Sequence, residues 1–533
     1  MANPRLFPFL LVAVLSCSGG GQRAEQPEHP NVLFVAVDDL NDWVGCMRGH
    51  PQALTPNIDR LAARGVLFTN AHTAAPACNP SRAAVFSGRL ATVTGVWANQ
   101  GGQTLDRTYP EGILLPTAFK DSGYRVWGTG KLLHSGGKSL FDEYFTVGQR
   151  WSPLSQEAVE YTDAELPSKG TDNPKHVTAD SLGRTVVLPL NRMPSDRRPN
   201  RSAGESFDWG AFDVPDSDFG DTQITDWAIE RIQGSHDRPF FLGVGYYRPH
   251  IPLWAPKRFF DRFEESPGEL PPVRGDDLDD LSATARHWAL EPVTAGSHAT
   301  VVKHGQWRAA VEAYLASVTY VDHEIGRLLD ALDRSGASAN TIIVLWSDHG
   351  WHLGEKEHWG KWTGWERSTR VPLIVAPARS RTADYAIGGS SAEPASLIDI
   401  FPTLVELSGV SGPSQFDGQS LVELMRQPDL ETGRAAVTLF NPDNVSLRTA
   451  RWRYIRYEDG TEELYDHQSD PNEWVNLAAS ADHVDQVRDL RKRAIPYLTE
   501  GASLARAAKS GLGGEYSGLR LALASVERAP VVE

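Results

Sequence analysis

The strongest chemical signature in the chain begins at Cys78 and reads Cys-Asn-Pro-Ser-Arg-Ala-Ala-Val-Phe-Ser-Gly. A cysteine can act as a covalent nucleophile when a base and an oxyanion-binding group lie beside it. Pro80 favours a helix that starts here, which would place residue 78 at the positive end of a helix dipole. The same residues also fit a plainer role, in which Cys78 is a small buried side chain ahead of a structural helix. The pattern alone leaves both interpretations open.

Further polar groups follow four segments that are predicted to be strands because they are short, apolar and rich in β-branched or aromatic residues. Open α/β sheets build their sites at the carboxyl ends of their strands, so we expect these groups to lie close together. The groups are Asp38 and Asp39 after segment 32–37, Lys131 and His134 after 124–127, His250 after 240–245, and Asp348 and His349 after 341–346.

Three of these side chains are carboxylates, namely Asp38, Asp39 and Asp348. Each one alone would be ordinary in a turn or at a helix cap. Buried together, they would repel one another unless a cation lay between them. Because oxygen ligands suit Ca²⁺ or Mg²⁺ better than zinc, the sequence predicts a site for one of these ions.

The elements that would position these groups alternate between strands and helices along the chain. A further strand is expected at 371–375, and helices at 55–65, 309–332 and 394–408. Such alternation predicts an α/β domain whose mostly parallel sheet is covered by helices on both faces.

Two long stretches, 148–216 and 263–305, lack this periodicity. We interpret them as loops that form the walls of the site, with disordered insertions as the alternative. The residues around Lys361, most of them basic or aromatic, allow either a sugar-binding surface or ordinary loop packing. They are His352, Glu355, Lys356, His358, Trp362 and Trp365.

The pattern changes near residue 436. Segment 451–457 alternates between apolar and polar residues, Asp459-Gly460 is typical of a hairpin turn, and 462–465 would return as the second strand. A helix is expected at about 482–497. We therefore predict a catalytic domain over 30–435 and a C-terminal subdomain, an antiparallel sheet with a helix, over 436–500. Residues 501–533 are left unassigned.

The first seventeen residues have the features of an export signal, with Arg5 ahead of the apolar segment 6–15. Leu15-Ser16-Cys17 resembles a bacterial lipoprotein cleavage box. It predicts export to the periplasm, with a lipid on Cys17 as an anchor at the cell envelope and plain secretion as the alternative. Residues 18–29, rich in glycine and glutamine, would form a tether.

Composition narrows the set of partners. The 533 residues include 52 Lys and Arg against 68 Asp and Glu, a formal net charge of −16. A chain this acidic is a poor candidate for nucleic-acid binding.

Of its three cysteines, Cys17 and Cys78 have proposed chemistry, which leaves Cys46 alone. We therefore expect no disulfide, and a Cys46–Cys78 bridge is the competing arrangement.

The run Cys78-x-Pro80-Ser81-Arg82-x-x-x-Phe86-x-Gly88 resembles the signature by which type I sulfatases are recognised for conversion of cysteine to formylglycine. The segments 31–43, 248–252 and 346–361, the last with Asp348-His349-Gly350, are similar to the iduronate-2-sulfatase branch of that family. Segment 463–478 is similar to the C-terminal subdomain of sulfatases. The resemblance implies the alkaline-phosphatase-like fold, with a large mixed, mostly parallel sheet between helices.

The resemblance also implies roles for individual residues. Cys78 would be converted to formylglycine by a formylglycine-generating enzyme or another sulfatase-maturating enzyme. The hydrated aldehyde would attack the sulfur of a sulfated carbohydrate. The implied metal ligands, for Ca²⁺ or alternatively Mg²⁺, are Asp38, Asp39, Cys78, Asp348 and His349. The implied anion-site residues are Arg82, Lys131, His134, His250 and Lys361.

Within that scheme, Arg82 would hold the developing negative oxygen on residue 78. His250 and Lys361 would lie near the sulfate and its leaving oxygen, and His134 would take a proton as sulfate departs. Two other functions fit the same residues. One is a phosphoesterase or phosphonate hydrolase of the same superfamily, and the other is a sulfated-glycan-binding protein that is never converted.

Overall fold

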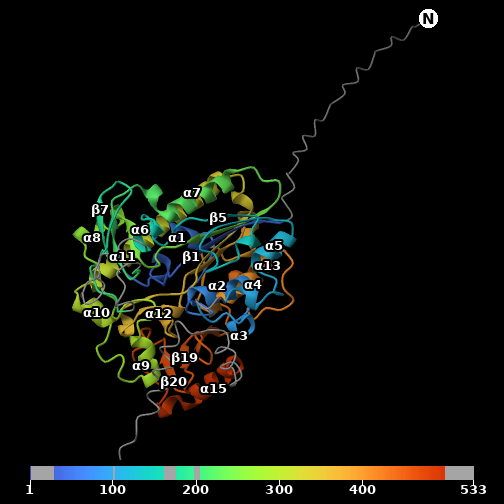
Figure 1. Cartoon of the computed structure of the whole chain (residues 1–533). Helices are drawn as coiled ribbons and strands as arrows, with labels where there is room; N and C mark the ends of the chain where they lie inside the picture. Colours follow the sequence, from blue (N-terminus) through green and yellow to red (C-terminus); the bar gives the residue numbers. More distant parts are fainter. Residues whose placement is uncertain (2–28, 100–102, 161–175, 197–204, 499–533) are drawn as a thin grey trace, which may run out of the picture.

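The computed structural model describes Met1 and residues 29–99, 103–160, 176–196 and 205–498 (Figure 1). An eight-stranded mixed sheet lies at its centre. The neighbouring strands β11, β1, β9, β4 and β5 run parallel, while β14 is antiparallel to both β11 and β2. The predicted large, mostly parallel sheet is therefore confirmed. In spatial order the strands are β15 (Ser390–Ser391), β2 (Val66–Phe68), β14 (Leu373–Ala376), β11 (Thr341–Ser347), β1 (Asn31–Val37), β9 (Phe240–Tyr246), β4 (Arg125–Gly130) and β5 (Glu143–Phe145).

Helices cover both faces of the sheet, and the central strand β1 is apolar on both sides for that reason. Val32, Phe34 and Ala36 belong to one buried cluster, whereas Leu33 and Val35 belong to the other. The helices of the first cluster include α2 (Cys78–Ser87), α5 (Leu115–Asp121) and α13 (Ile400–Ser408). Those of the second include α1 (Pro56–Ala62), α7 (Gly220–Gln233) and α11 (Trp307–Arg334).

A smaller antiparallel sheet with a helix forms the C-terminal part of the described chain, coloured red in Figure 1. One face packs on the helix through Val487 and Leu490. The other face packs against Trp362 and Trp365, which follow Lys361 in the chain. Its strands are β17 (Ala436–Leu439), β18 (Val445–Arg448), β19 (Trp452–Arg456) and β20 (Glu462–Asp466), and its helix is α15 (Val484–Ala494).

Two expectations about local structure were wrong. The helix expected at 394–408 begins only at Ile400, because Ser396 and Asp399 form a capping box around a short 3₁₀ turn that precedes it. The stretches 148–216 and 263–305 are not simply loops. They contain β7 (Thr185–Leu188), β8 (Trp209–Phe212), α9 (Ala283–Leu290) and α10 (His298–Lys303), which are too short to give a clear periodicity.

Shorter elements include β3 (Ala71–His72), α3 (Ala91–Thr94), α4 (Leu105–Thr108), α6 (Gln156–Glu160), β6 (His176–Ala179), β10 (Leu253–Pro256), α8 (Arg262–Glu265), β12 (His352–Leu353), β13 (Trp359–Gly360), α12 (Glu366–Thr369), β16 (Ala395–Ser396) and α14 (Val422–Arg426). The expected signal, the lipid site at Cys17, nearly all of the tether and the tail lie outside the described residues. Within the described ranges, no helix combines the length and apolarity that a membrane crossing requires.

Candidate active site

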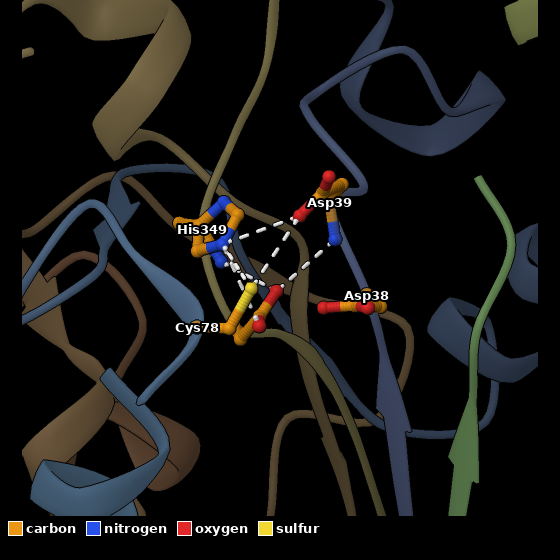
Figure 2. Close-up of side chains that lie close together, drawn as sticks. Asp38, Asp39, Cys78 and His349 are labelled. Atoms are coloured by element: carbon orange, nitrogen blue, oxygen red, sulfur yellow. Dashed lines mark hydrogen bonds and ion pairs between the residues drawn. The ribbon is translucent and has the colours of Figure 1, made fainter. Parts of the chain in front are cut away.

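Residues that follow separate strands meet at one edge of the central sheet. Asp38 and Asp39 follow β1, and Asp348 and His349 follow β11, while Cys78 is the first residue of α2. One ligand atom from each of these five residues lies within 4.8 Å of all the others, and all five residues are buried. Figure 2 shows the side chains of Asp38, Asp39, Cys78 and His349 close together. The structure thus brings together the five residues for which a metal site was expected.

The backbone of Asp39 has a positive φ of 60°, a conformation that is uncommon for a residue with a side chain. The buried hydroxyl of Tyr314, on α11, donates a hydrogen bond to the Asp39 carbonyl at 2.8 Å and accepts one from Asn41 N–H at 2.9 Å. The Asp39 amide donates to Asp348 Oδ1 at 3.1 Å. Tyr314 therefore helps to hold the turn that presents Asp39. The sequence analysis missed it, because it lies within an ordinary amphipathic helix.

The Asp348 backbone is held by two hydroxyl groups that were also missed. Thr73 Oγ1 and Ser81 Oγ donate to the Asp348 carbonyl at 2.7 and 2.5 Å. Ser81 belongs to the motif that starts at Cys78, so the motif itself fixes the turn after β11. Thr73 carried no comparable signal in the sequence.

The Cys78 thiol lies among nitrogen atoms from three other segments. Its Sγ atom is 2.9 Å from Lys361 Nζ, 3.4 Å from His349 Nε2 and 3.5 Å from Lys131 Nζ. Burial raises the pKa of Cys78 to about 12, although the charges of Lys131 and Lys361 act in the opposite direction. The thiol is therefore protonated at neutral pH, which disfavours the unmodified cysteine as a nucleophile. Cys46 and Cys78 are both free, so the competing disulfide is not present in the structure.

Three cations balance the three carboxylates. Arg82 donates to Asp348 Oδ2 at 2.9 Å and to Asp38 Oδ1 at 3.1 Å, and Lys131 also pairs with Asp38. Lys361 lies 2.8 Å from Asp39 Oδ1. The remaining Arg82 donor contacts the carbonyl groups of residues 131 and 132. These contacts hold the two carboxylates in place, and the role expected of Arg82, to hold an oxygen on residue 78, stays a prediction.

The two candidate acid–base histidines are neutral. His250 lies with Nδ1 2.6 Å from the Ile251 carbonyl, so Nδ1 carries the proton and Nε2 points towards Asp39 Oδ2 at 3.8 Å. His134 Nδ1 is buried and has no hydrogen-bond partner among the described residues. Burial, followed by the charge of Lys131, lowers the pKa of His134 to about 3 and that of His250 well below its ordinary value. Both rings are therefore in the neutral form at neutral pH.

The cluster of Asp38, Asp39 and Asp348 is suited to bind a divalent cation. Asp39 Oδ2 is buried without a hydrogen-bond partner among the described residues, an arrangement that is costly unless another group binds it. Burial raises the pKa of Asp39 to about 7, and although Lys361 opposes this, the charges of Asp38 and Asp348 add to it. A cation beside these oxygens would remove that cost, and hard carboxylate ligands favour Ca²⁺ or Mg²⁺.

The aromatic residues around Lys361 are packed inside the protein. Trp362 and Trp365 are each 1% exposed. His352 and His358 are also buried, and His358 lies within hydrogen-bonding distance of the carbonyls of Ala289 and Lys361. Loop packing, rather than a sugar-binding surface, accounts for these four side chains.

The large mixed sheet, with the buried cluster of Asp38, Asp39, Cys78, Asp348 and His349 at the carboxyl ends of its strands, is consistent with the alkaline-phosphatase-like fold. A family model described as sulfatase matches residues 30–410, and a second, described as N-sulphoglucosamine sulphohydrolase, C-terminal, matches residues 354–498. The chain belongs to the sulfatase family, whose members hydrolyse sulfuric esters.

Two curated relatives support this assignment. A sulfatase of Formosa agariphila is 36% identical over 481 residues, which cover 89% of this chain and 88% of that protein. Iduronate 2-sulfatase of Mus musculus is 29% identical over 451 residues, covering 75% of this chain and 74% of that protein.

Two solved structures show the shared fold. The phosphonate monoester hydrolase of Agrobacterium radiobacter has a TM-score of 0.68 at 21% identity and covers 88% of this chain and 95% of its own. A protein solved in complex with its substrate D-glucosamine-2-N,6-O-disulfate has a TM-score of 0.62 at 20% identity. The match covers 87% of this chain and 96% of that protein's chain.

Proposed function

We propose that this protein removes sulfate from a sulfated carbohydrate, in the manner of iduronate-2-sulfatase, using formylglycine at position 78 and a bound Ca²⁺ or Mg²⁺. The observation that carries this proposal is the position of Cys78 Sγ. It lies within the group of five potential metal ligands and 2.9 Å from Lys361 Nζ, yet the thiol itself is protonated at neutral pH. Iduronate 2-sulfatase and an ulvan-active sulfatase are among the relatives, and their names favour a carbohydrate substrate.

The residues of the site would have separate roles in this reaction. Asp38, Asp39, Asp348, His349 and residue 78 would hold the cation. When bound, the cation would lower the pKa of a hydroxyl on hydrated formylglycine and polarise a sulfate oxygen. Lys131 and Lys361 would bind sulfate oxygens, since both ammonium groups already point at position 78. Arg82 would keep two of the carboxylates in place.

The two histidines would act in different steps. His250, with Nε2 directed at Asp39, would assist the transfer of sulfate from the sugar oxygen. His134 would accept a proton as sulfate leaves residue 78, since its buried Nδ1 atom has no hydrogen-bond partner among the described residues. Such positioned acid–base groups typically contribute a factor of about 10² to 10⁴ in rate.

Expression in a host that contains a sulfatase-maturating enzyme tests the proposal. We expect mass spectrometry to find an aldehyde in the residue-78 peptide, and the protein to hydrolyse an aryl sulfate faster than the matched aryl phosphate. Cys78→Ala should be folded and inactive. Fast turnover of the phosphate would instead support a phosphoesterase. Tight binding of sulfated saccharides by unconverted, inactive protein would support a glycan-binding role. A screen of defined sulfated saccharides would then identify the sugar and the sulfate position.

We also propose that the protein is exported to the bacterial cell envelope and that Cys17 carries a lipid. This rests on the sequence pattern of residues 1–17. In fractionated cells, the wild-type protein should stay with the membranes and Cys17→Ala should be released into the soluble periplasmic or culture fraction. Equal release of both proteins would contradict lipid attachment.

A further inference from the structure

The carboxylate of Asp221 holds the backbone of the turn that leads to His250. Asp221 lies in the first turn of α7, is 3% exposed, and accepts hydrogen bonds from the amides of Tyr247 at 2.8 Å and Arg248 at 2.9 Å. Tyr247 follows β9 directly. The direction of the chain as it leaves β9 is thus fixed by a side chain from a different element.

The side chain of Arg248 is buried and makes its hydrogen bonds to backbone carbonyls. On one side it donates to Trp254 at 2.8 Å and to His250 at 3.5 Å. On the other it donates to Ser152 at 3.0 Å and to Arg150 at 3.3 Å, at the start of the stretch that was expected to wall the site. The guanidinium group of Arg248 therefore links the turn that carries His250 to residues 150–152.

Among the described residues, the hydrogen bond and the aromatic contact of the His250 ring both come from its own turn. Its Nδ1 lies next to the carbonyl of Ile251, one residue away, and its ring packs beside Tyr247 at 4.6 Å between centroids. Both partners belong to the same turn. The orientation of Nε2 relative to Asp39 therefore depends on how rigidly the turn itself is held.

Burying charged groups is costly, and they are retained only where hydrogen bonds satisfy them. Asp221 and Arg248 are both nearly inaccessible, and their hydrogen bonds converge on the turn that carries His250. We propose that Asp221 and Arg248 are positioning residues that set the place and the direction of His250 Nε2 for sulfate transfer. The catalytic part of this inference rests on the proposed function.

The chain offers a matched control in Asp322, on α11. It is 2% exposed and accepts hydrogen bonds from the two backbone amides of Asn57 and Ile58, which belong to α1. Burial raises the pKa of Asp221 and of Asp322 alike, to about 6. The two aspartates thus have similar surroundings, but only Asp221 holds a segment of the candidate active site.

The experiment compares Asp221→Asn and Arg248→Lys with Asp322→Asn, each with a melting curve and with kinetics on an aryl sulfate at a temperature where it is folded. We expect Asp221→Asn and Asp322→Asn to lower the melting temperature by similar amounts. We expect kcat to fall about tenfold in Asp221→Asn and about a hundredfold in Arg248→Lys with little change in KM, because small misplacements of a reacting group are costly. Asp322→Asn should keep its kcat. Equal kcat in Asp221→Asn and Asp322→Asn would overturn the inference.

A second measurement separates this inference from the proposed function. Nitrogen-15 NMR of labelled histidine, with the His250 signals assigned from His250→Gln, reports which ring nitrogen carries the proton. We expect a protonated Nδ1 in the wild type and in Asp322→Asn, and altered His250 signals in Asp221→Asn and Arg248→Lys. Unaltered signals would overturn the positioning role. A wild type without sulfatase activity would refute the proposed function alone.

Discussion

The ammonium group of Lys361 lies 2.9 Å from the Sγ atom of Cys78. It also pairs with Asp39 Oδ1 at 2.8 Å, and its side chain is only 2% exposed. Burial lowers the pKa of Lys361, but Asp39 and the nearby acidic groups raise it well above its ordinary value, so it is charged. A fixed cation at this distance from position 78 can stabilise negative charge that develops on a sulfate oxygen there.

Replacing Lys361 should therefore affect the chemical step. We expect Lys361→Met to lower kcat by a factor of about 10² to 10³, the usual effect of removing one fixed donor from an oxyanion site. Steady-state kinetics on an aryl sulfate would measure it. Lys257→Met, which changes a half-exposed lysine paired with Asp261, is the control and should keep full activity. Comparable kcat in the two variants would exclude Lys361 from the reaction.

Removing the proposed metal should reduce activity and stability together. Without a cation, Asp39 Oδ2, which has no hydrogen-bond partner in the described part of the chain, lies buried beside two other carboxylates. A ligand at a hundredfold excess over its Kd adds about 2.7 kcal/mol to the free energy of unfolding. We expect a chelator to abolish turnover and lower the melting temperature, and Ca²⁺ or Mg²⁺ to restore both. Asp39→Asn should bind the ion more weakly, and full activity in metal-stripped protein would contradict the site.

The proposed division between the two histidines predicts distinct time courses. His134→Ala should release about one equivalent of alcohol in a burst and then stall without releasing matching sulfate, because only the second step is blocked. His250→Ala should slow the burst itself. Stopped-flow release of an aryl alcohol, with sulfate measured in parallel, distinguishes them. The opposite pattern would exchange the two roles, and slow turnover without a burst in either variant would leave both as electrostatic contributors.

A histidine that the mechanism does not use, His298, should make the fold sensitive to acid. His298 accepts a hydrogen bond from Trp359 Nε1 at 2.9 Å, and burial lowers its pKa from 6.5 to about 4. Between these values the unfolded chain binds more protons than the native chain, so the free energy of unfolding falls as the pH falls. Allowing for partial exposure, His298 should contribute roughly 1 kcal/mol of this loss.

The melting temperature should be measured at about pH 7 and at about pH 4.5. These two values span most of the range between the pKa of His298 in the unfolded chain and its pKa in the native protein. The glutamine of His298→Gln can accept the same hydrogen bond but does not titrate. We expect the variant to lose less melting temperature than the wild type between the two pH values. An equal loss would show that His298 does not contribute.

The sequence predicted the site better than its surroundings. Parallel strands end at one edge of a sheet, so the residues after β1 and β11 had to meet, and the motif at Cys78 supplied the rest. The supports of the site could not be predicted in this way. Tyr314 and Asp221 act on turns far away in the sequence, and their residue types are common in helices. The burial of Trp362 and Trp365 was equally hidden, because it depends on the C-terminal sheet that packs over them.

The burial of Cys78 has a consequence for the order of events in the cell. Its side chain is 1% exposed, and every residue of α2 is buried with it. In the folded protein the Cys78 side chain is therefore out of reach of another enzyme. If residue 78 becomes formylglycine as proposed, its conversion must precede the closure of the fold. The activity of a preparation would then be set during synthesis, by competition between folding and modification, and protein that folds first would remain inactive.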